Sequence, residues 1–447
     1  MRYLLFAWAL LFVALLLLIV GRGRRGGALL LSYCFGLSII HVPGALIYLG
    51  TAQGLIEERE TQLGFTATII GMASLLMGAA VAGRLSRSRS GRLHDAGADY
   101  MRLSFVMITC GLALYFILWP AISLVPSATA VLSSFAALLP FSFWCYFYTV
   151  IRDRRDGRLL FGLALLPLLP ILTMVVGGFI GYGIMWVSAV VALIYVVSPR
   201  KKLLALIAIP ICYLGLSFGV AYFSGRQELR ETVWYEQADL GARIDRISDM
   251  VSKFELLDFS NSEHIAFLSN RLNQNLLVGI AIERHDAGRF DLAMGRTIPL
   301  WLFIPRAIWP EKPEVGGGGR VVSDFTGISF AYGTSVGAGQ TLEFYVNFGW
   351  AGIVGGFLLL GYALMRLDIE LAAAFRAGNV RRLIEVGLPG LALLQPGGNL
   401  LEILVAVAGS IVAAKTVIFG LKRFGELGEV STRHRLSGNA ARRREAN

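Results

Sequence analysis

Apolar runs of about the length of a membrane span recur along the whole chain, separated by mostly short polar connections. A helix needs about 20 mainly apolar residues to cross the roughly 30 Å hydrocarbon core of a bilayer. The pattern therefore predicts an all-α polytopic membrane protein with about eleven transmembrane helices. The expected spans are residues 3–20, 28–49, 64–83, 102–120, 128–150, 159–176, 179–198, 203–223, 343–365, 383–395 and 400–420.

Basic residues occupy every second connection between these runs. The basic connections are 22–25, 84–92, 152–158, 200–202 and 366–382, and the tail 422–447 is also basic. Cytoplasmic connections of membrane proteins carry an excess of lysine and arginine. The alternation therefore predicts an N-terminus on the outer side of the membrane and a C-terminus in the cytoplasm.

Three segments leave room for another interpretation. Residues 159–198 could form one long span with a surface segment, although only two spans keep the charge alternation. The run 383–395 is short and ends at Gln395-Pro396-Gly397-Gly398-Asn399, so it could be a tilted or re-entrant helix buried in protein. The first run lacks a small-x-small cleavage site and is followed directly by arginines, so we expect a retained anchor.

Composition narrows the class of protein further. Of 447 residues 55% are apolar and only 16% are charged, against about 25% in a typical soluble domain. The net charge of +11 could suggest nucleic acid, but residues 224–342 carry 12 basic and 15 acidic residues, so the surplus belongs to the opposite side. This distribution argues against a nucleic-acid partner. The four cysteines fall within expected spans, without metal-ligand spacing, and we expect no metal or cofactor.

The chain divides into four parts on this interpretation. Residues 1–223 hold the first eight spans, 224–342 form one large periplasmic loop, 343–421 hold the last three spans, and 422–447 form a basic cytoplasmic tail. Loops of this length are usually functional or disordered, and this one is too apolar and aromatic for disorder. We therefore expect the active site in the loop.

Two helices are predicted at the start of the loop. Residues 229–257 have apolar positions at helical spacing, which predicts a helix on the membrane surface or on the bundle. Ser260 followed by Glu263 fits a capping box, which predicts a second helix running to about Ile282. In that helix His264, Arg271 and Asn275 would share one face.

Two blocks of unusual composition follow. The first is Ile304-Pro305-Arg306 through Trp309-Pro310-Glu311-Lys312-Pro313, which is rigid and interfacial in character. The second is Gly333-Thr334-Ser335 through Glu343-Phe344-Tyr345-Val346-Asn347-Phe348-Gly349 and Gly352. These blocks resemble the Wzy-type oligosaccharide repeat-unit polymerases, also called O-antigen polymerases. The similarity covers about residues 268–352, and the number of spans and the single large loop also match.

The resemblance implies an enzyme of the bacterial inner membrane that acts on undecaprenyl-diphosphate-linked oligosaccharides at the periplasmic face. It implies transfer of a growing glycan chain onto a new lipid-linked repeat unit, a glycosyltransferase-C-like fold without a metal, and a chain-length regulator as a partner. Family members often carry an arginine before the last long helix. Here Pro396–Asn399 and nearby Glu402 occupy that place, so another basic residue would have to contact phosphate.

The residue types suit this chemistry. Arginine binds phosphate through a planar fork and stays charged, so Arg271 and Arg306 are the expected diphosphate ligands, with Lys312 and Arg320 assisting. Glu343 is expected to accept the proton of the acceptor hydroxyl, with His264 as the alternative. Asn347 would position the sugar, and Trp309 and Tyr345 would stack on it. Salt bridges within the loop and an interfacial aromatic belt are the structural alternatives for these side chains.

Two other functions stay open. An O-antigen ligase would use the same chemistry with a different acceptor and would leave polymer unattached when the protein is absent. A lipid-linked oligosaccharide flippase or other transporter would need charged residues inside the bundle, where the spans hold few.

Overall fold

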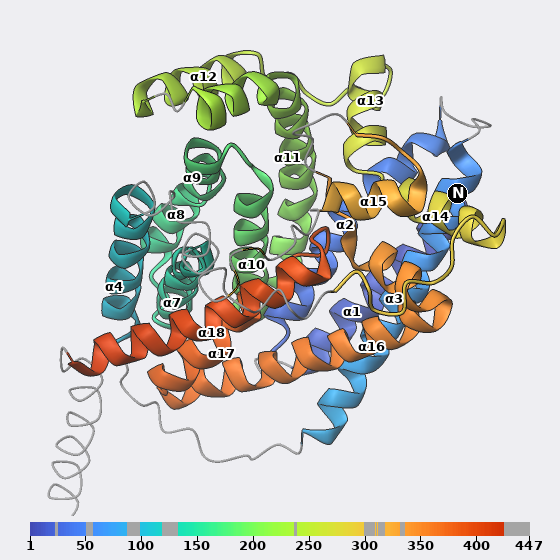
Figure 1. The fold of residues 1–447 in the computed structure, drawn as a ribbon. Helices are drawn as coiled ribbons and strands as arrows, with labels where there is room; N and C mark the ends of the chain where they lie inside the picture. The colour runs from blue at the N-terminus through green and yellow to red at the C-terminus, as the bar shows by residue number, and fades with distance from the viewer. Residues whose placement is uncertain are drawn as a thin grey trace, which may run out of the picture.

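The computed structural model describes residues 1–22, 26–50, 57–86, 99–118, 133–236, 239–298, 309, 311, 318–330 and 336–423. These residues form helices and contain no β-strand (Figure 1). The helices are α1 (Arg2–Arg22), α2 (Ala28–Leu46), α3 (Glu57–Leu85), α4 (Tyr100–Ala113), α7 (Leu138–Arg152), α8 (Asp156–Leu165), α9 (Leu168–Gly177), α10 (Gly181–Val197), α11 (Lys201–Arg230), α12 (Leu240–Ser252), α13 (Ser262–Arg271), α14 (Gln274–Asp286), α15 (Gly318–Thr326), α16 (Gly339–Ala377), α17 (Val380–Ala392) and α18 (Leu400–Arg423). Short 3-10 or π turns lie at Ile47–Leu49, Leu114–Leu118 and Glu231–Tyr235.

Within the described ranges, nine helical segments are long and apolar enough to cross a membrane. They are Arg2–Gly21, Ala28–Leu49, Glu57–Leu85, Tyr100–Ile117, Ser133–Arg152, Asp156–Gly177, Lys201–Val233, Gly339–Ala377 and Leu400–Arg423. The prediction of an all-helical, multi-pass membrane protein is thereby confirmed. The apolar helix α10 has 17 residues and α17 has 13, so the count of eleven spans stays a prediction.

The structure defines two of the three uncertain segments, residues 159–198 and 383–395. After α9 the chain turns at Gly178, which is left-handed with φ 70°, and α10 packs back so that Gly183 lies against Pro170. Residues 159–198 are therefore two apolar stretches rather than one long helix. Helix α17 is largely buried within the protein, as the alternative for residues 383–395 requires.

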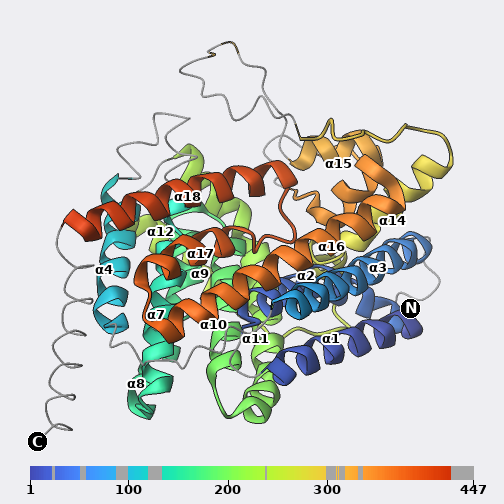
Figure 2. The same ribbon diagram turned by 90° about the horizontal axis from the view of Figure 1, so that it is seen from below.

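Helices α3 and α16 pack closely along their length, beside α1 (Figure 2). A Cβ atom added to Gly78 would lie 2.0 Å from the Leu358 carbonyl oxygen, and one added to Gly361 would lie 2.0 Å from that of Leu75. Small residues let membrane helices approach to backbone contact, where van der Waals packing holds them together. These glycines therefore bring α16, which carries the second motif block, against α3.

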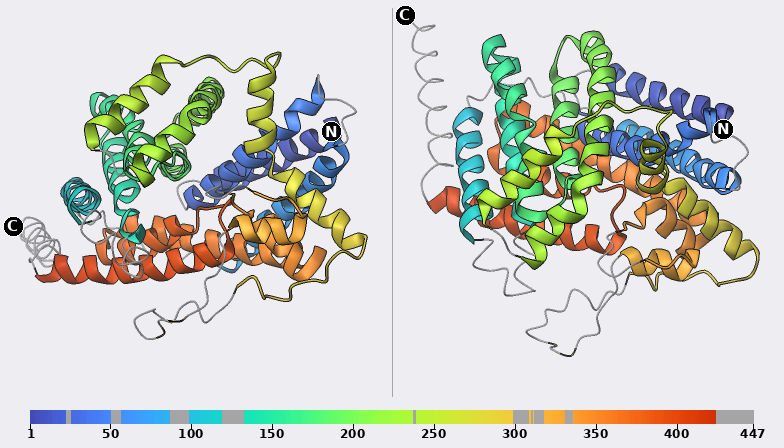
Figure 3. Two further views of the ribbon diagram at one scale, coloured as in Figure 1. Left: turned by 45° about the horizontal axis from the view of Figure 1, so that its top comes forward. Right: turned by 90° about the horizontal axis from the view of Figure 1, so that it is seen from above.

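The elements between α11 and α16 gather toward one end of the bundle (Figures 1 and 3). Helix α11 continues to Arg230, so the expected loop boundary at residue 224 falls inside a helix. Helix α12 then begins at Leu240, where the Asp239 side chain accepts from the Ala242 N–H at 2.8 Å. The predicted amphipathic helix over 229–257 is therefore two elements, because its first residues continue α11 and the π turn Glu231–Tyr235, whereas α12 begins separately at Leu240.

The second predicted loop helix is wrong at its start and in its length. Asn261, not Ser260, caps α13 by accepting from the Glu263 N–H at 2.9 Å, and the Ser260 hydroxyl donates to Asp258. The helix ends at Arg271, and α14 starts anew at Gln274. His264, Arg271 and Asn275 consequently do not share one helix face.

Candidate functional site

An arginine cluster forms where α13 meets the last turns of α11. Its members are Arg226, Arg230 and Arg271. The guanidinium carbons of Arg226 and Arg271 lie 4.9 and 5.4 Å from the centre of the same ring, Phe223. The guanidinium carbon of Arg230 lies 4.6 Å from the Phe179 ring. Aromatic faces attract guanidinium groups, so the two rings gather three like charges in one place.

Burial of these positive charges costs free energy unless a negatively charged or hydrogen-bonding partner is present. Arg226 and Arg230 are each only 9% exposed. Partial burial lowers the pKa of Arg271, an effect that Tyr222 opposes. Among the residues that the structure describes, no carboxylate forms an ion pair with Arg226 or Arg271. A buried charge is stable when it is paired or hydrogen-bonded, so Arg226 and Arg271 are suited to binding an anion.

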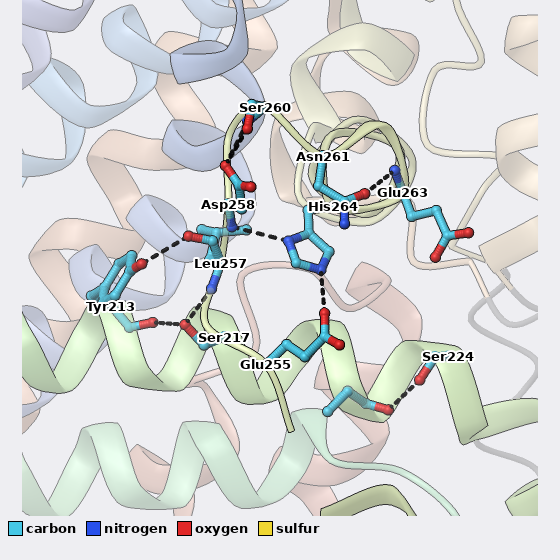
Figure 4. A network of polar contacts seen from close by, with 11 residues as sticks. Tyr213, Ser217, Ser224, Glu255, Leu257, Asp258, Ser260, Asn261, Glu263 and His264 are labelled. Atoms are coloured by element: carbon cyan, nitrogen blue, oxygen red, sulfur yellow. Dashed lines mark hydrogen bonds and ion pairs between the residues drawn. The ribbon is translucent and has the colours of Figure 1, made fainter. Parts of the chain in front are cut away.

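His264 and Glu255 lie beside the same stretch of α11 (Figure 4). Phe267, one turn after His264, packs against Phe223 with tilted rings whose centres are 5.0 Å apart, and so links this pair to the cluster. His264 Nδ1 accepts from the Asp258 backbone N–H at 3.0 Å, and Nε2 lies 3.9 Å from a Glu255 carboxylate oxygen. The His264 side chain is buried, whereas that of Glu255 is 74% exposed.

This geometry separates the roles open to the two residues. Because Nδ1 of His264 accepts a hydrogen bond, the neutral ring carries its proton on Nε2, which faces Glu255. His264 then has no lone pair left to accept a proton from a substrate. Glu255 has an exposed carboxylate that can accept one, 3.9 Å from His264 Nε2.

Two further hydrogen bonds hold the segment that carries Glu255. The Ser217 hydroxyl accepts from the Leu257 N–H at 2.9 Å, and the Tyr213 hydroxyl donates to the Leu257 carbonyl at 2.8 Å (Figure 4). Both partners belong to α11. The segment therefore packs on α11 in a defined register at Ser217, nine residues before Arg226 on the same helix.

Glu343 and Asn347 belong to a different place, a buried node within α16. Glu343 has no exposed surface, and its side chain accepts from the Leu400 backbone N–H. Asn347 accepts from the Gly295 N–H at 2.8 Å and donates to the Thr297 hydroxyl and the Glu343 carbonyl, each at 2.7 Å. Both amide protons of Asn347 are used, so in this structure it has no donor left for a sugar.

The node lies beside a kink in α16. Phe348 and Gly349 depart from helical geometry, and Gly349 has φ 61°. The N–H groups of Ala293 and Met294 donate to the carbonyls of Val346 and Asn347 at 2.8 and 3.1 Å. The second motif block is thus hydrogen-bonded to residues 293–297, which precede the first block in the sequence.

The same stretch of α16 also holds the segment before α18. Gln340 donates to the carbonyls of Gln395 and Gly398 at 2.7 and 3.1 Å, and its own oxygen accepts from Tyr33 at 2.6 Å. The Asn399 side chain accepts from the Ala338 N–H at 3.1 Å. The turn at Pro396–Asn399 is therefore a packed part of the protein.

The remaining predicted site residues are dispersed. Tyr345 is buried, its hydroxyl lies 3.3 Å from His285 Nδ1, and its ring contacts Trp350 edge-on. Arg320 is exposed on α15 and lies 3.9 Å from Asp324. Trp309 is partly exposed. Arg306 and Lys312 lie outside the described residues.

Of the arginines predicted to bind diphosphate, Arg271 lies in the arginine cluster. The cluster also contains Arg226 and Arg230, which the sequence analysis did not predict. Within the described ranges, no hydrogen bond or ion pair joins Arg271 to Glu343. Arg226 and Arg230 were missed because they follow an apolar run and were assigned to a loop. Their i, i+4 spacing on a continuing helix was the signal that could have found them. No group of three or more His, Cys, Asp and Glu side chains converges as metal ligands do in the part of the chain that the structure describes.

Comparison with protein-family models, with curated proteins and with solved structures finds no match to this chain.

Proposed function

We propose that this protein is a polysaccharide polymerase of the bacterial cytoplasmic membrane. It transfers a glycan chain from undecaprenyl diphosphate to a new lipid-linked repeat unit on the outer face. The observation that carries the proposal is the arginine cluster, in which Arg226 is 9% exposed and has no carboxylate ion pair among the described residues. A diphosphate supplies the missing negative charge and accepts bidentate hydrogen bonds from guanidinium groups.

The position of the cluster supports a lipid-borne diphosphate. Arg226 and Arg230 lie in the last turns of α11, whose preceding residues form a span with little burial inside the protein. The Tyr222 hydroxyl donates to the Gly178 carbonyl at 2.9 Å, so the turn between α9 and α10 lies at the same end. A diphosphate headgroup at a membrane surface would meet guanidinium groups held at the ends of spans.

In the proposed reaction, the bond between the donor sugar's anomeric carbon and the diphosphate oxygen breaks, and a bond to the acceptor hydroxyl oxygen forms. The arginines stabilise the negative charge that gathers on the leaving diphosphate. The hydroxyl proton passes to the Glu255 carboxylate, which His264 orients. Glu343 has a positioning role in this proposal, since it is buried and holds α18.

The experiment that tests this function is an analysis of lipid-linked glycans in a strain lacking the protein. The proposal expects single repeat units on undecaprenyl diphosphate to accumulate and long polymer to disappear. A ligase would instead leave long lipid-linked polymer, and a flippase would leave single units on the cytoplasmic side. Either of these two results would overturn the polymerase.

Complementation of that strain with variants links the function to the site. Arg226→Gln and Arg271→Gln are expected to fail to restore polymer at normal protein abundance. Arg246→Gln is the matched control, because Arg246 is an exposed arginine of α12 already paired with Glu228 at 3.2 Å. Full polymer in both cluster variants would contradict the assignment of the site.

A further inference from the structure

The connection between α13 and α14 is held on α2 and α3 by hydrogen bonds that begin directly after Arg271. The Leu272 carbonyl accepts from the Gly44 backbone N–H at 3.0 Å. The Asn273 side chain donates to the Thr61 hydroxyl at 3.1 Å. Because Arg271 is the last residue of α13, the chain is fixed from the very next residue onward.

The pair formed by His41 and Asn275 completes this attachment. Asn275 Nδ2 donates to the His41 carbonyl at 2.7 Å, and Asn275 Oδ1 lies 2.6 Å from His41 Nδ1. The amide nitrogen is used by the carbonyl, so the amide oxygen meets the ring and Nδ1 of His41 carries the proton. Asn275 has no exposed surface and His41 is 1% exposed. Water therefore competes for neither hydrogen bond.

A proline explains why α2 offers backbone groups at this place. Pro43 lies inside α2 and has no N–H, which interrupts the hydrogen bonds of the helix. Backbone groups freed by a proline in a membrane helix take partners from neighbouring segments. Here the bonded groups, the His41 carbonyl and the Gly44 N–H, lie on either side of Pro43.

Glycines bring the connection into direct contact with both helices. A Cβ atom added to Gly44 would lie 2.2 Å from Cβ of Asn273. One added to Gly64 of α3 would lie 1.9 Å from the Asn275 carbonyl oxygen. The connection consequently has little room to shift against α2 and α3.

Helix α13 meets α11 mainly through apolar side chains. Phe267 packs against Phe223, and its ring would lie 2.9 Å from a Cβ atom added to Gly219. Apolar contact is non-directional, so it does not by itself determine where the last residue of α13 lies. The hydrogen bonds that follow Arg271 are directional and supply that definition.

We propose that His41 and Asn275 are positioning residues, which place Arg271 in the arginine cluster by fixing the residues that follow it. This inference rests on the proposed function, because it concerns how the diphosphate site is assembled. A guanidinium group binds two phosphate oxygens only when its distance and angle are right. Asn275 acts through Arg271, four residues earlier, and not on the ligand itself.

The test measures binding of undecaprenyl diphosphate by the full-length protein in lipid nanodiscs. Asn275→Ala and His41→Leu are each expected to weaken binding about tenfold. His41→Asn should recover most of the affinity, because its amide nitrogen is bonded to Cγ as Nδ1 is and can donate in its place. The matched control is Ser32→Ala, which removes a buried hydrogen bond of 2.9 Å to Ser188 from the same helix α2 and should leave binding unchanged.

A double-mutant cycle separates positioning of Arg271 from a general defect in folding. Added to Arg271→Gln, Asn275→Ala should cause no further loss of affinity, because the guanidinium that it positions is already absent. Added to Arg226→Gln, it should cause the full further loss of about tenfold. A general defect would lower the affinity by the same factor in both backgrounds.

The outcomes distinguish this inference from the proposed function. Normal binding by Asn275→Ala, an equal loss in Ser32→Ala, or the same further loss in both arginine backgrounds would overturn the positioning role and leave the proposed function intact. If Asn275→Ala does not fold, the comparison of His41→Asn with His41→Leu decides in its place.

A protein that does not bind undecaprenyl diphosphate even when unaltered would instead overturn the proposed function. The placement of α13 is then tested by hydrogen exchange without ligand. Its amides should exchange faster in Asn275→Ala than in Ser32→Ala, and equal rates would overturn the inference.

Discussion

The Glu343 carboxylate of α16 accepts a hydrogen bond from the backbone N–H of Leu400, the first residue of α18. A helix N-terminus has unpaired N–H groups and a positive dipole, which a carboxylate satisfies. The contact joins the second motif block to the last span. Glu343 therefore has a structural role, which is to accept a hydrogen bond at the N-terminus of α18, independent of any role in a reaction.

Replacement of Glu343 should therefore first affect stability. Glu343→Ala leaves the Leu400 N–H without its acceptor and should lower the free energy of unfolding by about 1–3 kcal/mol. Glu343→Gln keeps an amide oxygen as acceptor and should lose less. Denaturant unfolding in detergent would measure both variants, with Glu263→Ala on the exposed face of α13 as the control. A Glu343→Gln protein of normal stability that forms no polymer would show that Glu343 takes part in the reaction itself.

The arginine cluster should be sensitive to the shape of the cation as well as its charge. Arg226→Lys keeps one positive charge but cannot offer the planar fork that binds two phosphate oxygens at once. We expect it to weaken undecaprenyl diphosphate binding about tenfold, measured with the protein in lipid nanodiscs. Arg246→Lys on the neighbouring α12 should bind normally. Normal binding by Arg226→Lys would show that the cluster supplies charge alone or does not hold the diphosphate.

Sequence reasoning located the spans well because hydropathy is a local property. Runs such as 28–49 and 400–420 correspond to Ala28–Leu49 and Leu400–Arg423. The residues at which the helices begin and end were harder to predict from the sequence. Residues around Arg226 belong to α11 only because the helix continues beyond the apolar run. Ser260 fits a cap pattern, yet its hydroxyl is used by Asp258.

The candidate site was less predictable because it depends on contacts distant in the chain. The cluster exists because Arg271 of α13 reaches the ring of Phe223 on α11, and no local pattern reports that crossing. Asn347 has the right residue type to bind a sugar, but both of its amide protons are used within the protein. The i, i+4 spacing of Glu343 and Asn347 did not show that both side chains are buried and hydrogen-bonded within the protein.

Substitutions of Glu255 and His264 are expected to lower the activity to different extents. Removal of a general base typically lowers a rate by about 10²–10⁴-fold, so Glu255→Gln should reduce polymer formation by at least about a hundredfold. His264→Asn should reduce it less, since the carboxylate is kept and only its orientation is lost. The assay uses lipid-linked units extracted from the deletion strain and the purified protein.

Two comparisons separate chemistry from folding in that experiment. Glu255→Asp retains a carboxylate and should recover part of the activity. Glu263→Gln removes an exposed carboxylate from α13 and should have no effect. Full activity of Glu255→Gln would remove this residue from the mechanism while leaving the arginine cluster untouched.

The packing of α3 against α16 gives a prediction that is independent of function. A Cβ atom on Gly361 would lie 2.0 Å from the Leu75 carbonyl oxygen, which is backbone and cannot rotate away. Gly361→Ala should therefore force the two helices apart and lower the free energy of unfolding by about 1–3 kcal/mol. Gly355 lies on the same helix with nothing within 4 Å of its ideal Cβ position. Gly355→Ala should be neutral or slightly stabilising, because alanine favours the helix. Equal stability of the two variants, measured by thermal unfolding in the same detergent, would contradict the close approach of α3 and α16.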